Sequence, residues 1–343
     1  MTYPLIRHSS RAVLAVLAAL SFAPSVLAQE VNLYTTREPG LIKPLMDSFT
    51  KSTGIKVNSI FIKDGLAERV AAEGGRSPAD VLMTVDIGAL VDLVDKGLTQ
   101  PVQSAVLERA VPANLRGKGG EWFALSLRAR VVYARKDLNL TSFTYEQLAD
   151  PQWKGKICTR AGQHPYNTAL IAAYIAHHGE ARAETWLNGF KSGLARPATG
   201  GDRDGARDIM GGVCDIAVAN SYYVGLMRSG TGGPEQQKWG AAIKVILPTF
   251  AGGGTHVNVS GASVARNSPN RAAAVRFLEY LVSDEAQKIY AEADYEYPVK
   301  AGATVHPLIA ALGSLTVDTL SVADVARHRT TASKLVDKVG FDR

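Results

Sequence analysis

The feature that most restricts the fold of this 343-residue chain is a regular alternation of strand-like and helix-like segments. Residues 31–36 and 55–61 have the alternating apolar pattern of strands, and residues 41–53 between them have helical spacing that ends at Gly54. Such alternation is typical of βαβ units, in which a parallel sheet is covered by helices on both faces. A second set of units begins near Trp122. The sequence therefore predicts an α/β fold.

The length of the chain favours two lobes over one, because single hydrophobic cores stop growing near about 250–300 residues. The second set of units leaves the first lobe and later returns to it, which predicts a hinge with a central cleft. Ligands of α/β sheets bind at the carboxyl ends of strands, and pockets are common between domains. We predict a first lobe of residues 29–124 and 250–297, and a second lobe of residues 125–249 and 298–343, each a mostly parallel sheet between helices.

The N-terminal segment has the three parts of a secretory signal peptide. Arg7 and Arg11 give it a positive start, residues 12–23 are apolar, and small residues precede Ala28. We predict a signal peptide over residues 1–28. A membrane anchor is the alternative, but the apolar run is short for a bilayer.

The composition indicates a globular protein, with 46% hydrophobic and 20% charged residues. The predicted signal peptide contains two arginines and no acid, so its removal lowers the formal charge from +6 to +4. This excess leaves open an anionic ligand or a solvated basic surface. No run of Lys and Arg indicates nucleic-acid binding. No nucleophile elbow or phosphate loop indicates an enzyme, so we expect a binding protein without catalytic residues.

Two adjacent tyrosines, Tyr222 and Tyr223, follow the apolar strand pattern of residues 214–219. Neighbouring side chains of a strand point to opposite faces, so the two phenols can share a target only beyond the end of the strand. Ser221 is a residue type that caps helices well. We therefore expect both tyrosines on the first turn of a helix, at the cleft.

Tyr166 lies in a comparable place, in the polar loop of residues 163–168 that follows a strand pattern at residues 156–158. Pro165 restricts this loop, and Thr168 is a candidate cap for the helix that we expect from the next residue onward. Tyr166 is therefore also predicted at a strand-to-helix turn.

The only two cysteines, Cys158 and Cys214, are expected to form a disulfide, as an even pair in an exported protein does. A thiolate metal site is the alternative, but no His or Cys lies at metal-finger spacing. The disulfide would make two strands neighbours and bring Tyr166 near Tyr222 and Tyr223.

Three phenols that meet in a wet cleft suit a hard trivalent cation. Fe³⁺ prefers anionic oxygen donors, and a phenol keeps its proton at neutral pH unless a cation displaces it. Three phenolates would neutralise Fe³⁺ and leave three positions of an octahedron for water or a small anion. The alternative is that each tyrosine is an ordinary amphipathic residue of the core or surface.

Seven short motifs occur in a fixed order: YTTR (34–37), SPADV (77–81), PANLR (112–116), RARV (128–131), AHHG (176–179), NSYY (220–223) and GTHVNVSG (254–261). Together they resemble the periplasmic ferric-iron-binding proteins that supply ABC importers. The resemblance covers nearly the whole chain after the predicted signal peptide.

The resemblance implies a two-lobed periplasmic binding protein of class II type that is located in the periplasm. Carried over residue by residue, the three cleft tyrosines of the family fall on Tyr166, Tyr222 and Tyr223. The implied cargo is Fe³⁺, and the implied partners are the permease and the ATPase of an ABC importer. We expect a monomer.

One departure from the family concerns the loop after Arg37. Relatives often have a His-Tyr pair there, and that Tyr is a fourth iron ligand, whereas this chain has Glu38 and Pro39. A proline has no side chain that binds a metal. Glu38 remains open as a carboxylate ligand or a solvated acid. We therefore expect iron on the second lobe alone.

The remaining positions around the iron would be filled by carbonate, another small carboxylate or water. Arg37 and Arg128 are the candidate anion-binding or supporting residues, because a guanidinium matches a planar carboxylate bidentately. Each could instead form a surface or interlobe salt bridge, and Arg203 is a weaker candidate. The rival function is the same fold with a small organic or inorganic anion, such as a carboxylate or phosphonate, bound without metal.

Overall fold

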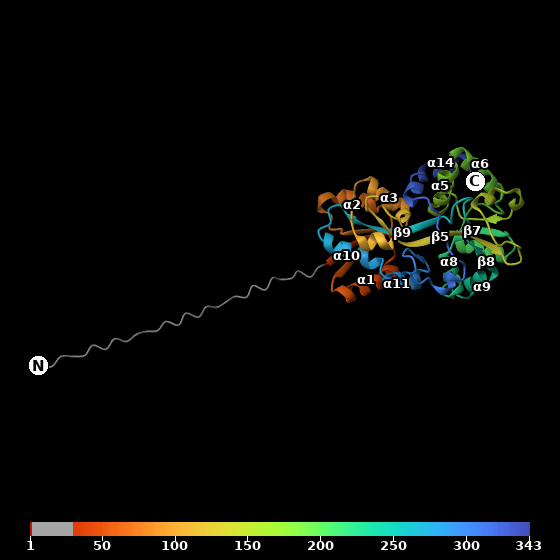
Figure 1. Ribbon diagram of the computed structural model, residues 1–343. Helices are drawn as coiled ribbons and strands as arrows, with labels where there is room; N and C mark the ends of the chain where they lie inside the picture. The colour runs from red at the N-terminus through yellow and green to blue at the C-terminus, as the bar shows by residue number, and fades with distance from the viewer. Residues whose placement is uncertain (2–29) are drawn as a thin grey trace.

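The computed structural model describes Met1 and residues 30–343. Apart from Met1, the predicted signal peptide lies outside the described residues. The chain forms two lobes that are connected by long strands, as Figure 1 shows. None of the helices within residues 30–343 has the length and apolar character that a membrane crossing requires.

One continuous path of hydrogen-bonded strands passes through both lobes, in the order β2–β1–β3–β9–β5–β7–β6. The first lobe contributes a parallel group, β1 (Glu30–Thr35), β2 (Lys56–Phe61) and β3 (Val81–Thr84). The second contributes a parallel pair, β6 (Ile157–Cys158) and β7 (Ile216–Asn220). The central and edge strands are β5 (Phe123–Arg135), β9 (Val257–Ala265), β4 (Thr99–Gln100), β8 (Ile243–Ile246) and β10 (Tyr297–Pro298).

The α/β class and the two lobes agree with the expectation from the sequence, but the middle of the sheet is antiparallel. β9 runs antiparallel to β3 and to β5, and β5 runs antiparallel to β7 and β8. The expectation of mostly parallel sheets holds only within the groups β1–β2–β3 and β6–β7. It fails in the middle because β5 leads the chain out of the first half of the sheet and β9 leads it back, so these two strands run in opposite directions.

The 13-residue strand β5 belongs to both halves of the sheet. Its residues from Phe123 to Ala129 pair with β9, and its residues from Arg130 onward pair with β7 and β8. All residues of β7 and β9 are buried, as expected for strands with helices on both faces. The strand therefore changes partners after Ala129. The lobe boundary between residues 124 and 125 stays a prediction from the sequence.

Helices cover both faces of each half of the sheet (Figure 1). Those around the first half are α1 (Pro39–Thr53), α2 (Leu66–Glu73), α3 (Ile87–Asp95), α4 (Ala105–Ala110), α10 (Arg271–Leu281) and α11 (Asp284–Asp294). Those around the second half are α5 (Pro165–His178), α6 (Glu180–Ser192), α7 (Asp202–Met210), α8 (Tyr222–Arg228), α9 (Pro234–Ala242) and α14 (Arg329–Val339).

The C-terminal segment touches elements of both halves. Helix α13 (Val322–Ala326) packs against α3 and α5, and α14 packs against α5 and α6. Arg329 donates from Nη1 to Oδ1 of Asp86 at 2.7 Å, directly across Gly88, where an added Cβ would lie 1.3 Å from the arginine. The short helix α12 (Pro307–Ala310) packs on α8.

The predicted disulfide between Cys158 and Cys214 is confirmed, with Cα atoms 5.9 Å apart. Cys158 ends β6, Cys214 lies just before β7, and these two strands pair in parallel with Ile157 opposite Ile216. The covalent link therefore joins the two strands whose carboxyl ends lead to α5 and α8.

Replacing both cysteines with alanine should destabilise the fold, because the disulfide closes a loop with a sequence separation of 56. Loop-closure entropy predicts a loss of about 4 kcal/mol in the free energy of unfolding. Urea unfolding of the wild type and of the double variant measures it. As a control, reductant should lower the stability of the wild type and leave that of the double variant unchanged. A difference in the free energy of unfolding below about 1 kcal/mol would contradict the expected effect of the disulfide.

Candidate metal centre

Tyr222 and Tyr223 lie where the sequence places them, on the first turn of a helix that follows a buried strand. β7 ends at Asn220 and α8 begins at Tyr222. Their ring centroids are 4.1 Å apart. Ser221, however, does not cap α8 with its side chain, because its hydroxyl accepts from the backbone N–H of Ala129 at 3.2 Å. That contact fixes the turn to β5.

The helix that carries Tyr166 begins about one turn earlier than expected. Helix α5 begins at Pro165, so Tyr166 belongs to its first turn and not to a loop. The cap is His164, whose Nδ1 accepts from the backbone N–H of Tyr166 at 3.2 Å, whereas Thr168 donates its hydroxyl to the carbonyl of Pro165. Burial and the nearby Arg160 charge lower the pKa of His164 to about 4, so this nitrogen remains free to accept.

The three tyrosines converge from two helix starts. The hydroxyl oxygens of Tyr166 and Tyr222 are 3.3 Å apart, and the ring of Tyr223 lies against that of Tyr222. Burial raises the pKa of Tyr222 well above its usual value, and burial followed by the charge of Asp202 raises the pKa of Tyr223. Both phenols therefore keep their protons until a cation displaces them.

A cavity of about 300 Å³ lies between the helix starts that carry Tyr166 and Tyr222 and the first lobe. Tyr166, Tyr222 and Arg128 line it on one side, and Glu38 and Val85 line it on the other. Tyr223 does not line this cavity, and its ring faces Arg203 instead, with the guanidinium carbon 5.6 Å from the ring centroid.

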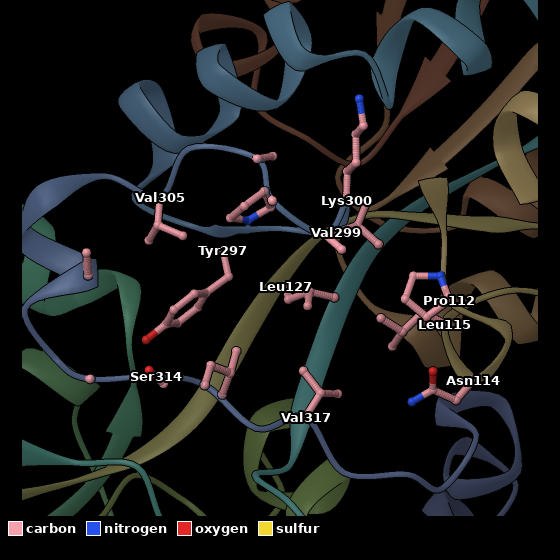
Figure 2. Close-up of a pocket in the computed structure, with 17 residues that line it drawn as sticks. Pro112, Asn114, Leu115, Leu127, Tyr297, Val299, Lys300, Val305, Ser314 and Val317 are labelled. Carbon is pink, nitrogen blue, oxygen red and sulfur yellow. The ribbon is translucent and has the colours of Figure 1, made fainter. Parts of the chain in front are cut away.

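A larger cavity of about 660 Å³ lies elsewhere, between β5 and the loop after β10 (Figure 2). Its lining is mainly apolar, as Leu127, Val299, Val305 and Val317 in Figure 2 illustrate, and Tyr297 is its one phenol. The smaller cavity, with two phenols and several charged groups, is the better match to a hard cation.

Arg37 is buried in a salt bridge. Its Nη1 donates to Asp294, and its Nη2 donates to the Ser260 hydroxyl at 2.6 Å and to Glu296 at 3.2 Å. Only its Nε lacks a hydrogen-bond partner within residues 30–343. This salt bridge is buried among residues of the first lobe, so it is neither the surface nor the interlobe pair that was the alternative, and the anion-binding role of Arg37 stays a prediction.

Arg128 is placed differently. Its Nη2 donates to the backbone carbonyls of Val85 and Val259, and its guanidinium carbon lies 5.9 Å from the ring centroid of Tyr166. In the described part of the chain its Nε has no partner, and no carboxylate forms a salt bridge with it. Arg128 therefore carries a positive charge at the cavity that no acid offsets directly.

Glu38 is exposed and lines the same cavity, and Pro39 is the first residue of α1. The proline fits this position because the first helical N–H needs no intrahelical partner. The location of Glu38 is compatible with both interpretations of its side chain.

Sequence reasoning missed a buried polar network behind the tyrosines. Arg130 donates to Asp202 at 2.8 Å and to Asn220 at 3.0 Å from Nη1, and to Asn167 at 2.6 Å from Nη2. A signal existed, because Arg130 is a charged residue inside an apolar strand and must have a buried partner. Arg160 was missed too, and its guanidinium carbon lies 4.8 Å from the ring centroid of Tyr166.

Comparison with known families matches residues 34–288 to the bacterial extracellular solute-binding proteins. Among curated relatives, iron uptake protein A2 of Synechocystis is 41% identical over 330 residues, covering 95% of this chain and 94% of that protein. The major ferric iron-binding protein of Neisseria meningitidis serogroup B is 28% identical over 340 residues, covering 94% and 96%.

Solved structures show the same similarity. The Bordetella ferric binding protein is 63% identical with a TM-score of 0.89, over 92% of this chain and 100% of that one. The Trichodesmium protein IdiA (FutA), solved in complex with iron and citrate ligands, is 43% identical with a TM-score of 0.86, over 91% and 99%.

The acids around Arg37 should make stability depend on pH. Burial raises the pKa of Asp294 to about 7, and the Glu296 charge adds to this against the opposing effect of Arg37. Between about pH 4 and pH 7 the folded protein therefore holds a proton that the unfolded chain has released, so stability falls as pH rises. Asp294 changes the free energy of unfolding by at most about 1.4 kcal/mol per pH unit in this range.

Urea unfolding of iron-free protein at pH 5, 6, 7 and 8 tests this expectation. Asp294→Asn should remove the Asp294 part of the slope, because the amide does not titrate. Glu296 does not interfere, since its pKa is lowered and it titrates below this range. Equal slopes for variant and wild type would contradict the assignment.

Proposed function

The chain belongs to the bacterial extracellular solute-binding proteins, and we propose that it captures Fe³⁺ through the phenolates of Tyr166, Tyr222 and Tyr223. The observation that carries the proposal is that Tyr166 and Tyr222 line one cavity with their hydroxyl oxygens 3.3 Å apart, while the ring of Tyr223 lies against that of Tyr222. Three phenolates would cancel the charge of Fe³⁺, which suits a hard cation in a half-buried site.

An exogenous ligand completes the iron site in this proposal. Three coordination positions remain, for carbonate, another small carboxylate or water. Arg128 is the favoured anion partner, because its charge meets no carboxylate directly in residues 30–343, whereas the terminal nitrogens of Arg37 are already engaged. Glu38 lies near enough to the cavity to take part when the lobes close.

The protein acts as a carrier and not as an enzyme in this proposal. It works in the periplasm as a monomer, holds iron on the second lobe, and closes the first lobe over it by a hinge motion. The permease and ATPase of an ABC importer receive the cargo. The relatives support this assignment, since the Synechocystis and Neisseria proteins are named for iron uptake and ferric iron binding.

Binding of an anion without metal is the second candidate, and the charge of Arg128, which forms no salt bridge within residues 30–343, favours it. The two functions differ in what the tyrosines do. Fe³⁺ needs the phenolates as ligands, whereas an anion needs only neutral hydroxyl donors.

Titration of iron-free protein with ferric citrate tests the proposal. Phenolate-to-iron charge transfer should give the protein an orange to red colour with a visible absorption band. Tyr222→Phe and Tyr223→Phe should each remove most of the band and weaken iron binding by more than the roughly 10–100-fold typical of supporting residues of metal sites.

Tyr174→Phe is the matched control, because Tyr174 lies on α5 like Tyr166 but stacks on Trp186, away from the cavity. A wild type that stays colourless would overturn the iron proposal. A Tyr166→Phe variant with full iron affinity would show that Tyr166 is not a ligand, and would leave the assignment of Tyr222 and Tyr223 in place. Calorimetry with carbonate or a phosphonate in the absence of iron would detect the alternative function.

A further inference from the structure

We infer that Arg130 and Asp202 form a positioning pair that sets the three tyrosines in place before iron arrives. The inference rests on the proposed function, because it concerns the same site. It assigns a role to two residues that contact no metal themselves.

Arg130 holds both tyrosine-bearing segments at once. Its partners Asn167 and Asn220 lie one residue after Tyr166 and two residues before Tyr222. Asn220 is also opposite Arg130 in the pairing of β5 with β7, and its carbonyl accepts from the Tyr133 hydroxyl at 2.9 Å. A single guanidinium therefore fixes the spacing between the start of α5 and the end of β7.

Asp202 completes the connection from a third element. It is the first residue of α7, and its Oδ2 accepts from Arg130 and from the backbone N–H of Asn220 at 2.7 Å. Its Oδ1 lies 3.5 Å from Nη1 of Arg160, the arginine over the ring of Tyr166. The carboxylate therefore contacts Arg130 and Asn220 through one oxygen and lies beside Arg160 with the other.

Asn167 extends the network into the segment before α5. Its side-chain amide donates to the Thr159 hydroxyl at 3.0 Å and to the carbonyl of Arg160 at 2.9 Å. The turn that carries Tyr166 is therefore tied at several points, and each of these contacts depends on the orientation that Arg130 gives to the Asn167 side chain.

Stability alone is a weak reason for such a pair. Arg130 and Asp202 are 2% and 3% exposed, and the desolvation of two buried charges offsets most of their attraction. The planar fork of an arginine instead gives fixed directions to three acceptors, which a lysine cannot reproduce. Metal sites need this kind of support, because ligands must meet the ion within narrow limits of distance and angle.

The experiment compares Arg130→Met and Arg130→Lys with the wild type. The methionine variant should bind iron from ferric citrate about 10–100-fold more weakly, with a shifted charge-transfer band, because the two tyrosine segments are no longer held at one spacing. The lysine variant should recover thermal stability, since it can pair with Asp202, but not the band or the affinity.

Arg196→Met is the control. Arg196 donates from Nε to Asp208 at 2.7 Å, so it stabilises the same helix α7 without touching either tyrosine segment. This variant should lose stability while its iron affinity and band stay unchanged. Where Arg130→Met does not fold, Asn167→Ala releases only the Tyr166 segment and should give a smaller loss of the same kind.

Crystal structures of the iron-free wild type and variants separate this inference from the proposed function. In Arg130→Met or Asn167→Ala, the hydroxyls of Tyr166 and Tyr222 should move beyond hydrogen-bond distance even without iron. The positioning role would be overturned if the variants kept the wild-type arrangement of the tyrosines. In that case they would also keep the charge-transfer band that the wild type shows with iron. A colourless wild type with displaced tyrosines in the variants would overturn only the iron proposal.

Discussion

The change of partners along β5 is the constraint on which the site depends. Side chains of a strand alternate between faces, so Ser126, Arg128 and Arg130 share one face of β5. Ser126 donates to Glu296 in the salt-bridge network of the first lobe, Arg128 spans Val85 and Tyr166, and Arg130 holds the tyrosine segments. One strand face therefore aligns the polar groups of both lobes along a single line.

The charges around the tyrosines explain why an outside ligand belongs in the proposed site. Arg128, Arg160 and Arg203 all lie within about 6 Å of a tyrosine ring centroid. A neutral unit of Fe³⁺ and three phenolates would not offset this positive charge, and Asp202 already serves Arg130. An anion beside the iron would meet Arg128 and occupy the open coordination positions at the same time.

Much of the fold and the positions of the tyrosines could be predicted, because local rules determine them. Adjacent tyrosines after an apolar strand require a strand end, and the structure has it at Asn220. What local rules could not supply were long-range partners, such as the pairing of Arg37 with Asp294 and of Arg130 with Asp202. The start of α5 was misjudged because His164, an uncommon cap, replaced the expected Thr168. The lobe boundaries and the roles of the site residues remain predictions.

The contact between Arg329 and Asp86 across Gly88 gives ionic strength a role in the mechanics of the protein. Helix α13 packs against both α3 and α5, so a movement of α3 away from α5 must break its packing with one of them. If α14 stays with α5, the movement also separates the partly buried ion pair of Asp86 and Arg329. Dissolved salt screens such pairs and weakens them. The work needed to open the lobes should therefore fall as salt concentration rises, so that the surrounding electrolyte adjusts how readily the cleft opens.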